Sequence, residues 1–223
     1  DSSGVNILTS YNGATWVGTS GIQPSTAVAQ GVEWNGLTFV VNNTASGNIS
    51  YSYDGTNWIN VSATNNGEVV LWNRPHIGTM NILQPTVVGG AGTTSTMAYS
   101  MDGVNYRNIG NGIFTTQCNK IAWNGSIWVA VGQGTNTIAW SYDGLTWYGL
   151  GTSIFSTAGY YVTWNGTVWL ALGSGTNTIA TSSDGRTWTG QGSTIFDASG
   201  LAADWNGQSW VIGGRSTTLG NTL

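Results

Sequence analysis

The sequence carries very little charge. Asp, Glu, Lys and Arg make up only 6% of its 223 residues, whereas they make up about 25% of a typical soluble domain. Lys120 is the only lysine and the net charge is −4, so no basic patch is available to neutralise phosphates, which excludes nucleic acid as an expected partner. No apolar run is long enough to span a bilayer, so we expect no membrane insertion.

Cysteine is almost absent as well. Cys118 stands alone, so it has no partner for an internal disulfide, and we expect a small buried residue there. The chain begins at Asp1 without Met and without a signal-peptide pattern, so we expect a processed chain or a domain of a longer protein. The composition is not that of a disordered chain, because thirteen Trp and nine Tyr supply a large apolar area.

Two short segments recur along the chain. One is Trp-Asn-Gly, which begins at Trp34, Trp123, Trp164 and Trp205 and is degenerate at Trp72. The other, here called the Ser-Asp motif, is a seven-residue segment that reads Ser-x-Asp-Gly-x-Thr-Trp in its most regular form. Its five copies are Ser10–Trp16, Ser52–Trp58, Ser100–Tyr106, Ser141–Trp147 and Ser182–Trp188, spaced by 42, 48, 41 and 41 residues. A period near 40 to 45 residues is typical of four-stranded propeller blades.

Each repeat is predicted to contain four strands. In the most regular copy we expect strands at 119–123, 126–132, 137–142 and 145–149. Asn124-Gly125 is expected to form a two-residue hairpin turn, and Asp143-Gly144 the turn between the third and fourth strands.

The two ends of the chain complement each other. The N-terminal segment supplies only a third and a fourth strand, and the C-terminal segment only a first and a second. The sequence therefore predicts a single domain, a five-bladed all-β propeller of four-stranded antiparallel blades, whose ring is closed by a blade built from both termini. The shared blade is expected at 1–16 and 201–223, the other blades at roughly 17–58, 59–106, 107–147 and 148–188, and a connection at 189–200.

The Ser-Asp motif resembles the Asp-box, or BNR repeat, of sialidases and related propellers. The resemblance covers all five repeats and implies a hairpin turn in which the carboxylate accepts hydrogen bonds from its own backbone. We expect this structural role for Asp54, Asp102, Asp143 and Asp184, with Asn12 and Tyr106 as compatible departures from the motif. A ring of calcium-binding acids is the alternative, but each turn offers a single acid, whereas calcium takes several oxygen ligands. No cofactor or metal is expected.

The sialidase catalytic set that the resemblance would imply cannot be placed here. It requires an arginine triad, a Tyr–Glu pair and an acid/base Asp, and two of the four arginines, Arg107 and Arg186, lie in or beside Ser-Asp motifs. Glycoside hydrolysis in general needs two carboxylates across the scissile bond. Outside the motifs and termini the acids are Glu33, Glu68, Asp197 and Asp204. Glu33 and Asp204 occupy equivalent positions before a Trp and either form a catalytic pair or line a solvated channel.

The Asn73–Pro85 segment replaces a short turn in the second repeat and holds Arg74, His76 and Met80. His76 has no nearby Cys, Asp or Glu partner, so it makes a poor catalytic constellation. The segment is either a contact surface or a tolerated insertion.

A second repeated feature, Gly-x-Gly-Thr-Asn-Thr, points to a binding face opposite the Ser-Asp motifs. Its amide and hydroxyl groups, next to aromatic side chains, suit a sugar, although Thr and Asn are also ordinary turn formers. The candidate ligand-binding residues are Thr135, Asn136, Tyr160, Tyr161, Thr176 and Asn177.

The sequence therefore favours a non-enzymatic, lectin-like binding module that recognises glycans at several equivalent sites. The alternative is a structural or display domain of an extracellular or virion-surface assembly, with another surface protein as partner. A glycoside hydrolase is the third hypothesis.

Overall fold

The structure is a computed structural model that describes residues 7–18, 29–34, 38–43, 48–62, 66–71 and 85–217. The chain divides into two compact units, unit 1 (Asp1–Gly110) and unit 2 (Asn111–Leu223). Every regular element among the described residues is a β-strand, which confirms the all-β class. None of these residues forms a helix that is long and apolar enough to cross a membrane. Residues 73–84 of the Asn73–Pro85 insertion, with Arg74, His76 and Met80, lie outside the described residues, as do the side chains of Glu33 and Glu68.

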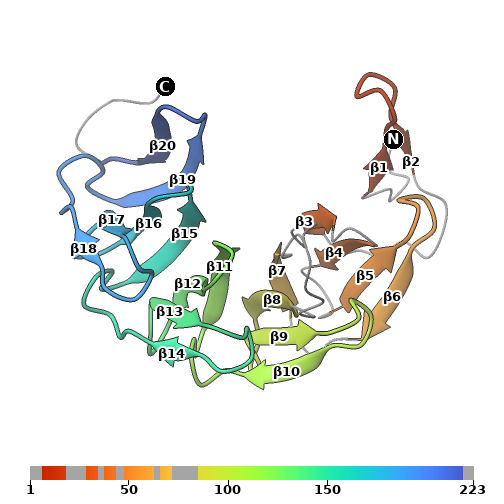
Figure 1. Ribbon diagram of the computed structural model, residues 1–223, viewed down its shortest axis with the longest axis horizontal. Helices are drawn as coiled ribbons and strands as arrows, with labels where there is room; N and C mark the ends of the chain where they lie inside the picture. The colour runs from red at the N-terminus through yellow and green to blue at the C-terminus, as the bar shows by residue number, and fades with distance from the viewer. Residues whose placement is uncertain are drawn as a thin grey trace. The chain divides into compact units, whose positions relative to one another are not determined.

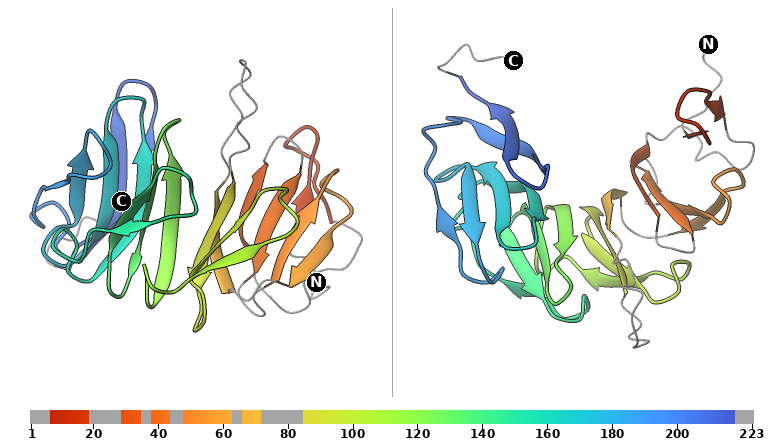
Figure 2. Two further views of the ribbon diagram at one scale, coloured as in Figure 1. Left: turned by 60° about the horizontal axis from the view of Figure 1, so that its bottom comes forward. Right: turned by 45° about the horizontal axis from the view of Figure 1, so that its top comes forward.

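Unit 1 contains a two-stranded antiparallel sheet followed by two groups of four strands, each paired in chain order. The two-stranded sheet consists of β1 (Leu8–Thr9) and β2 (Val17–Gly18). The first group, orange in Figure 2, consists of β3 (Ala29–Trp34), β4 (Phe39–Asn43), β5 (Asn48–Ser52) and β6 (Ile59–Ser62). The second group consists of β7 (Asn66–Leu71), β8 (Thr86–Ala91), β9 (Met97–Ser100) and β10 (Arg107–Gly110).

Unit 2 repeats this plan in the opposite order (Figure 1). Its first group consists of β11 (Gln117–Trp123), β12 (Trp128–Gln133), β13 (Ile138–Ser141) and β14 (Tyr148–Gly149). The second group consists of β15 (Ala158–Trp164), β16 (Trp169–Ser174), β17 (Ile179–Ser182) and β18 (Thr189–Gly190). A two-stranded sheet of β19 (Ser199–Trp205) and β20 (Trp210–Arg215) ends the unit.

The antiparallel order gives each sheet of unit 2 two distinct ends. The Ser-Asp motifs join the third strand of a group to the fourth, and the Asn-Gly turns join the first strand to the second, so both lie at one end, here called the motif end. The segments between the second and third strands, 134–137 and 175–178, lie at the other end, the loop end. The sheets therefore separate the Ser-Asp motifs from the Gly-Thr-Asn loops.

The prediction of a two-residue turn at Asn124-Gly125 is wrong. Trp123 pairs with Trp128, so four residues connect the strands, and the N–H of Asn124 donates to the carbonyl of Ile127. The Asn124 side-chain oxygen accepts hydrogen bonds from the backbone N–H groups of Ser126 and Ile127, both at 2.9 Å. Gly125 has a positive φ of 101°. The asparagine side chain thus closes an Asx turn.

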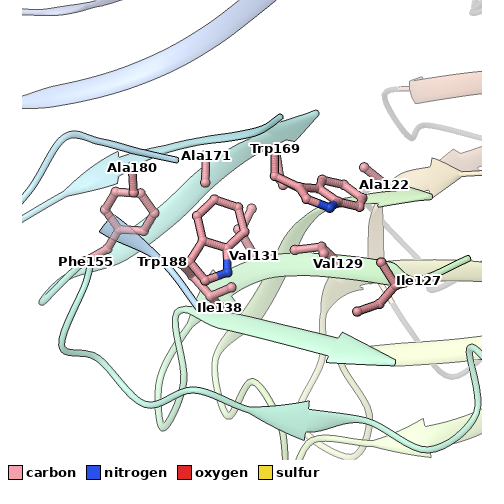
Figure 3. Packing of buried hydrophobic residues seen from close by; sticks show 11 residues of the cluster. Ala122, Ile127, Val129, Val131, Ile138, Phe155, Trp169, Ala171, Ala180 and Trp188 are labelled. Atoms are coloured by element: carbon pink, nitrogen blue, oxygen red, sulfur yellow. The ribbon is translucent and has the colours of Figure 1, made fainter. Parts of the chain in front are cut away.

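The core of unit 2 lies between its two four-stranded groups. Trp169 and Trp188 of the second group pack with Val129, Val131 and Ile138 of the first, and Figure 3 shows the Trp188 ring close to Val131 and Ile138. Trp169 and its counterpart Trp128 are fully buried, yet neither indole N–H has a hydrogen-bond partner. Their contribution to stability is therefore burial of apolar area, roughly 3 kcal/mol for a large side chain. The further core residues are Ala122, Ile127, Phe155, Val162, Ala171 and Ala180.

Candidate functional site

The Ser-Asp motif forms the same closed set of hydrogen bonds in the four copies that end in Trp, and the third copy lacks only the indole bond. In the last copy the Ser182 hydroxyl oxygen accepts from the N–H of Gly185 at 2.8 Å. The Asp184 carboxylate accepts from the backbone N–H groups of the next two residues, at 2.8 and 2.7 Å. The Trp188 indole donates to the carbonyl of Gly185 at 3.1 Å, and Gly185 has a φ of 71°. The carboxylate is therefore occupied by the turn that contains it.

These hydrogen bonds favour the ionised carboxylate and so lower its pKa. The backbone N–H of Thr187 is the main cause at Asp184, whose pKa falls to about 2. At Asp54 and Asp102 the N–H groups of Asn57 and Asn105 lower the pKa well below its usual range. All three groups are ionised at neutral pH.

Two copies of the motif differ at its Asp or Trp position. Asn12 stands in place of Asp, and its side-chain oxygen accepts the same two backbone N–H groups, at 2.9 and 2.8 Å. The turn therefore needs an oxygen acceptor but not a charge. Tyr106 stands in place of Trp, and its buried hydroxyl has no hydrogen-bond partner, which leaves a desolvated polar group in unit 1.

At the loop end of unit 2, Asn136 and Asn177 hold neighbouring chain segments together. The Asn177 side-chain N–H donates to the carbonyl of Ile154 at 2.7 Å, and its oxygen accepts from the N–H of Gly192 at 2.8 Å. Asn136 makes the same two bonds, to the carbonyl of Ile113 and the N–H of Gly151, at 2.7 and 2.8 Å. Both ends of each amide therefore bond to backbone of the same chain.

A second set of contacts at the loop end, here called the loop bridges, recurs every 41 residues. The N–H of Thr135 donates to the Thr115 hydroxyl oxygen at 3.1 Å, and the N–H of Thr176 donates to the Ser156 hydroxyl oxygen at 2.9 Å. In the third bridge, Asp197 accepts from the N–H of Thr217 and, at 2.9 Å, from its hydroxyl. All six side chains are exposed. Thr115, Ser156 and Asp197 are not among the predicted site residues, although their 41-residue spacing matches that of the repeats and could have indicated them.

Tyr160 and Tyr161 lie together on β15 but in different surroundings. The strand register shifts between Gly159 and Tyr161, so Tyr160 occupies a β-bulge. The Ser174 hydroxyl donates to the Tyr160 hydroxyl oxygen at 3.3 Å, which brings this side chain to the strand end beside Thr176. Of the two tyrosines, Tyr160 is thus the one that reaches the loop end.

Tyr161 faces the neighbouring first strands instead, since β15 contacts both β11 and β19. The Lys120 ammonium lies 5.3 Å from the centre of the Tyr161 ring. Burial, followed by the charge of Asp204, raises the pKa of Tyr161. The Asp204 carboxylate itself accepts from the N–H of Trp205 at 2.8 Å.

Phe114 and Phe155 lie in the segments just before β11 and β15, beside the loop end but not on its surface. Phe114 and Phe155 are fully buried. A Cβ on Gly132 would lie 2.7 Å from the Phe114 ring, and one on Gly173 would lie 2.6 Å from the Phe155 ring. The glycines thus make room for the rings, and the exposed groups of the loop end are mainly hydroxyls.

The described residues contain no group of three or more His, Cys, Asp or Glu side chains that could hold a metal ion. Cys118 is fully buried, and burial raises the pKa of its thiol. That thiol is accordingly protonated at neutral pH and shielded from solvent.

Comparison with known proteins gives evidence on the fold alone. No protein-family model matches the chain, and no curated protein sequence matches it. Among solved structures, a chain of a nidogen/laminin complex is similar at a TM-score of 0.52 and 15% identity, over 77% of this chain and 65% of that one. A GH74 enzyme of Niastella koreensis is similar at a TM-score of 0.50 and 15% identity, over 79% of this chain and 27% of that one. The protein thus spans less than two thirds of either relative, and its described strands form an all-β, propeller-like fold.

Proposed function

We propose that the protein is a non-enzymatic binding module that recognises glycans at the loop end of its sheets. The three loop bridges carry this proposal, because they present exposed hydroxyl groups at the same place in successive repeats. Sugar hydroxyls need donors and acceptors that are already in position, and fixed groups lose less entropy on binding. Asn136 and Asn177 contribute by holding the loops in place.

The proposed architecture is a single five-bladed Asp-box propeller, closed by a blade shared between the two termini. Five Ser-Asp motifs support the count. The two-stranded sheets support the shared blade, since β19–β20 corresponds to the first two strands of a group and β1–β2 to the last two. Val211 of β20 is 68% exposed, whereas its equivalents Val129 and Leu170 are 0% and 5% exposed. In a closed ring, the neighbouring sheet would cover β19–β20 and bury the Val211 side chain. Equivalent binding sites repeated around the ring would bind a glycan multivalently.

The test is a glycan-array screen of the wild-type protein beside a Thr135→Val, Thr176→Val double variant. Valine keeps the side-chain shape and removes the hydroxyl, so we expect binding to fall while the melting temperature stays close to that of the wild type. Thr152→Val is the matched control, because Thr152 is exposed on a nearby segment and belongs to no loop bridge. Alanine at Asn136 or Asn177 would be a poorer probe, since it also removes bonds that hold the loops. A blank array from folded wild-type protein would refute the proposal.

In that case a structural or display role on an extracellular or virion surface, with another surface protein as partner, becomes the better account. The similarity to a GH74 enzyme is the observation that favours the third hypothesis, a glycoside hydrolase. Hydrolysis would need a carboxylate pair, and the carboxylates of Asp197 and Asp204 each already accept a backbone N–H, that of Thr217 and that of Trp205. We therefore place binding first.

A further inference from the structure

Three aromatic side chains gather on the outer strands of the β11–β14 group, near its motif end. Trp140 and Tyr148 are directly paired residues of β13 and β14, and their rings are stacked at a centroid distance of 4.6 Å and an interplanar angle of 24°. Tyr142 meets Trp140 edge-on, with centroids 5.0 Å apart. Tyr142 is 56% exposed and Tyr148 is 50% exposed. With Arg186, these residues are called the aromatic patch.

Arg186 reaches the patch from the Ser-Asp motif of the next group. Its guanidinium carbon lies 5.8 Å from the Trp140 ring, and Nη1 donates to the Tyr142 hydroxyl oxygen at 3.2 Å. Nη2 lies 3.8 Å from Asp184 Oδ2. A cation over an indole ring and a hydrogen bond to a neighbouring phenol hold the patch in one arrangement.

The neighbouring β15–β18 group folds without aromatic residues at these positions. At the positions 41 residues further on, the β15–β18 group has Thr181, Ser183 and Thr189. That group forms the same antiparallel pairing, with Thr181 opposite Thr189 where Trp140 stands opposite Tyr148. Tyr148 is thus a half-exposed ring where the neighbouring sheet has a hydroxyl residue, which indicates a role in binding rather than in folding.

We propose that the aromatic patch is a second carbohydrate site, which takes an uncharged pyranose on the exposed Tyr148 ring. One face of this ring is stacked on Trp140, and the ring remains half exposed, so it offers a flat apolar surface to the C–H face of a sugar. The Tyr142 ring and Arg186 lie against Trp140, on which the Tyr148 ring stacks. With Asp184 they offer donors and acceptors for sugar hydroxyls. Arg186 and Asp184 carry opposite charges 3.8 Å apart, so no unpaired cation is offered to a sulfate group, and a neutral sugar suits the patch better than a sulfated one. The inference rests on the proposed glycan-binding function but places this site at the end opposite the loop bridges.

The test uses Tyr148→Thr, which introduces the residue found at the equivalent position 189 and therefore fits the fold. Its affinity is measured by calorimetry for neutral hexasaccharides of glucose, mannose and N-acetylglucosamine, and for a sulfated hexasaccharide. We expect Tyr148→Thr to weaken binding of a neutral hexasaccharide about fivefold or more, as the loss of one stacking contact implies. Tyr148→Phe keeps the ring and should keep the affinity. Equal melting temperatures would show that both variants fold.

Comparison with the Thr135→Val, Thr176→Val variant separates the two sites. Binding that is lost with Tyr148→Thr and kept with the threonine variant would establish the aromatic patch and overturn the loop-end site. The reverse result would overturn the aromatic patch and leave the proposed function standing. A blank result for every neutral hexasaccharide, or a preference for the sulfated one, would overturn the aromatic patch as proposed.

Discussion

Replacement of Asn177 by alanine should destabilise unit 2 measurably, although Asn177 lies in a surface loop. The amide bridges two segments that are 23 and 15 residues away from it, through the Ile154 carbonyl and the Gly192 N–H. Alanine removes both bonds and leaves both backbone groups without this partner. Ile154 and Gly192 are only half-buried, so water can replace part of what is lost.

The expected loss follows from these two bonds. Each contributes about 0.5–1.5 kcal/mol net, so together they contribute about 2 kcal/mol to the free energy of unfolding. For a domain of this size, a change of 1 kcal/mol shifts the melting temperature by about 2–4 °C. Asn177→Ala should therefore melt about 4–8 °C below the wild type. Asn136→Ala should behave alike, and the double variant should show roughly the sum, because the two side chains share no partner.

Differential scanning calorimetry measures this directly, with Thr152→Ala as the control on the exposed surface of an adjoining segment. The control should change the free energy of unfolding by less than about 0.5 kcal/mol. Asn177→Asp is the sharper variant, because it keeps the acceptor for Gly192 but places a carboxylate oxygen against the Ile154 carbonyl. It should lose at least as much stability as one bond provides. If Asn177→Ala melts within about 1 °C of the wild type, the amide does not hold the loop and the reasoning fails.

Three further predictions concern single groups. Tyr106→Phe should raise the free energy of unfolding by about 1 kcal/mol in urea titration, because it removes a buried hydroxyl without a partner; an unchanged midpoint would mean that water satisfies this group. Asp184→Asn should fold like the natural Asn12 copy and should lose less stability on acidification. The folded-state pKa of Asp184 is lowered to about 2, so its contribution is present above the unfolded pKa near 4 and is lost as the pH falls from 5 to 2; melting curves across that range would show an unchanged slope if the reasoning is wrong. Gly214→Ala should cost about 1–3 kcal/mol in thermal melts, because a Cβ there would overlap a phenylalanine ring, whereas a Cβ on the adjacent Gly213 would meet nothing within 4 Å; equal losses for the two variants would contradict this packing.

The sequence predicted the features that depend on near neighbours. The Ser-Asp motif draws its hydrogen bonds from within seven residues, so its position between the third and fourth strands could be inferred from the chain alone. The all-β class likewise follows from the repeat.

The contacts between distant segments could not be derived in the same way. The sequence predicts Asn136 and Asn177 as ligand-binding residues, but it does not show their bonds to backbone groups 15 and 23 residues away, which lie beyond any local pattern. The aromatic patch was missed for a related reason. Trp140 and Tyr148 become neighbours only when β13 pairs with β14 and Arg186 arrives from the next group. A comparison of the repeats at exposed positions would have marked Tyr148, since its counterpart is Thr189.

The hydrogen bonds within the Ser-Asp motifs also bear on the order in which the chain folds. Each motif completes its turn without residues outside it, and the strands of each group pair with their neighbours in sequence. Loop closure is therefore cheap at every step, and a hairpin can form before the rest of its sheet exists. The slow events are then the ones that bring successive sheets face to face, such as the docking of Trp169 and Trp188 on Val129 and Ile138. Because each repeat folds through the same local steps, the number of repeats can change without a change in the folding mechanism of each one.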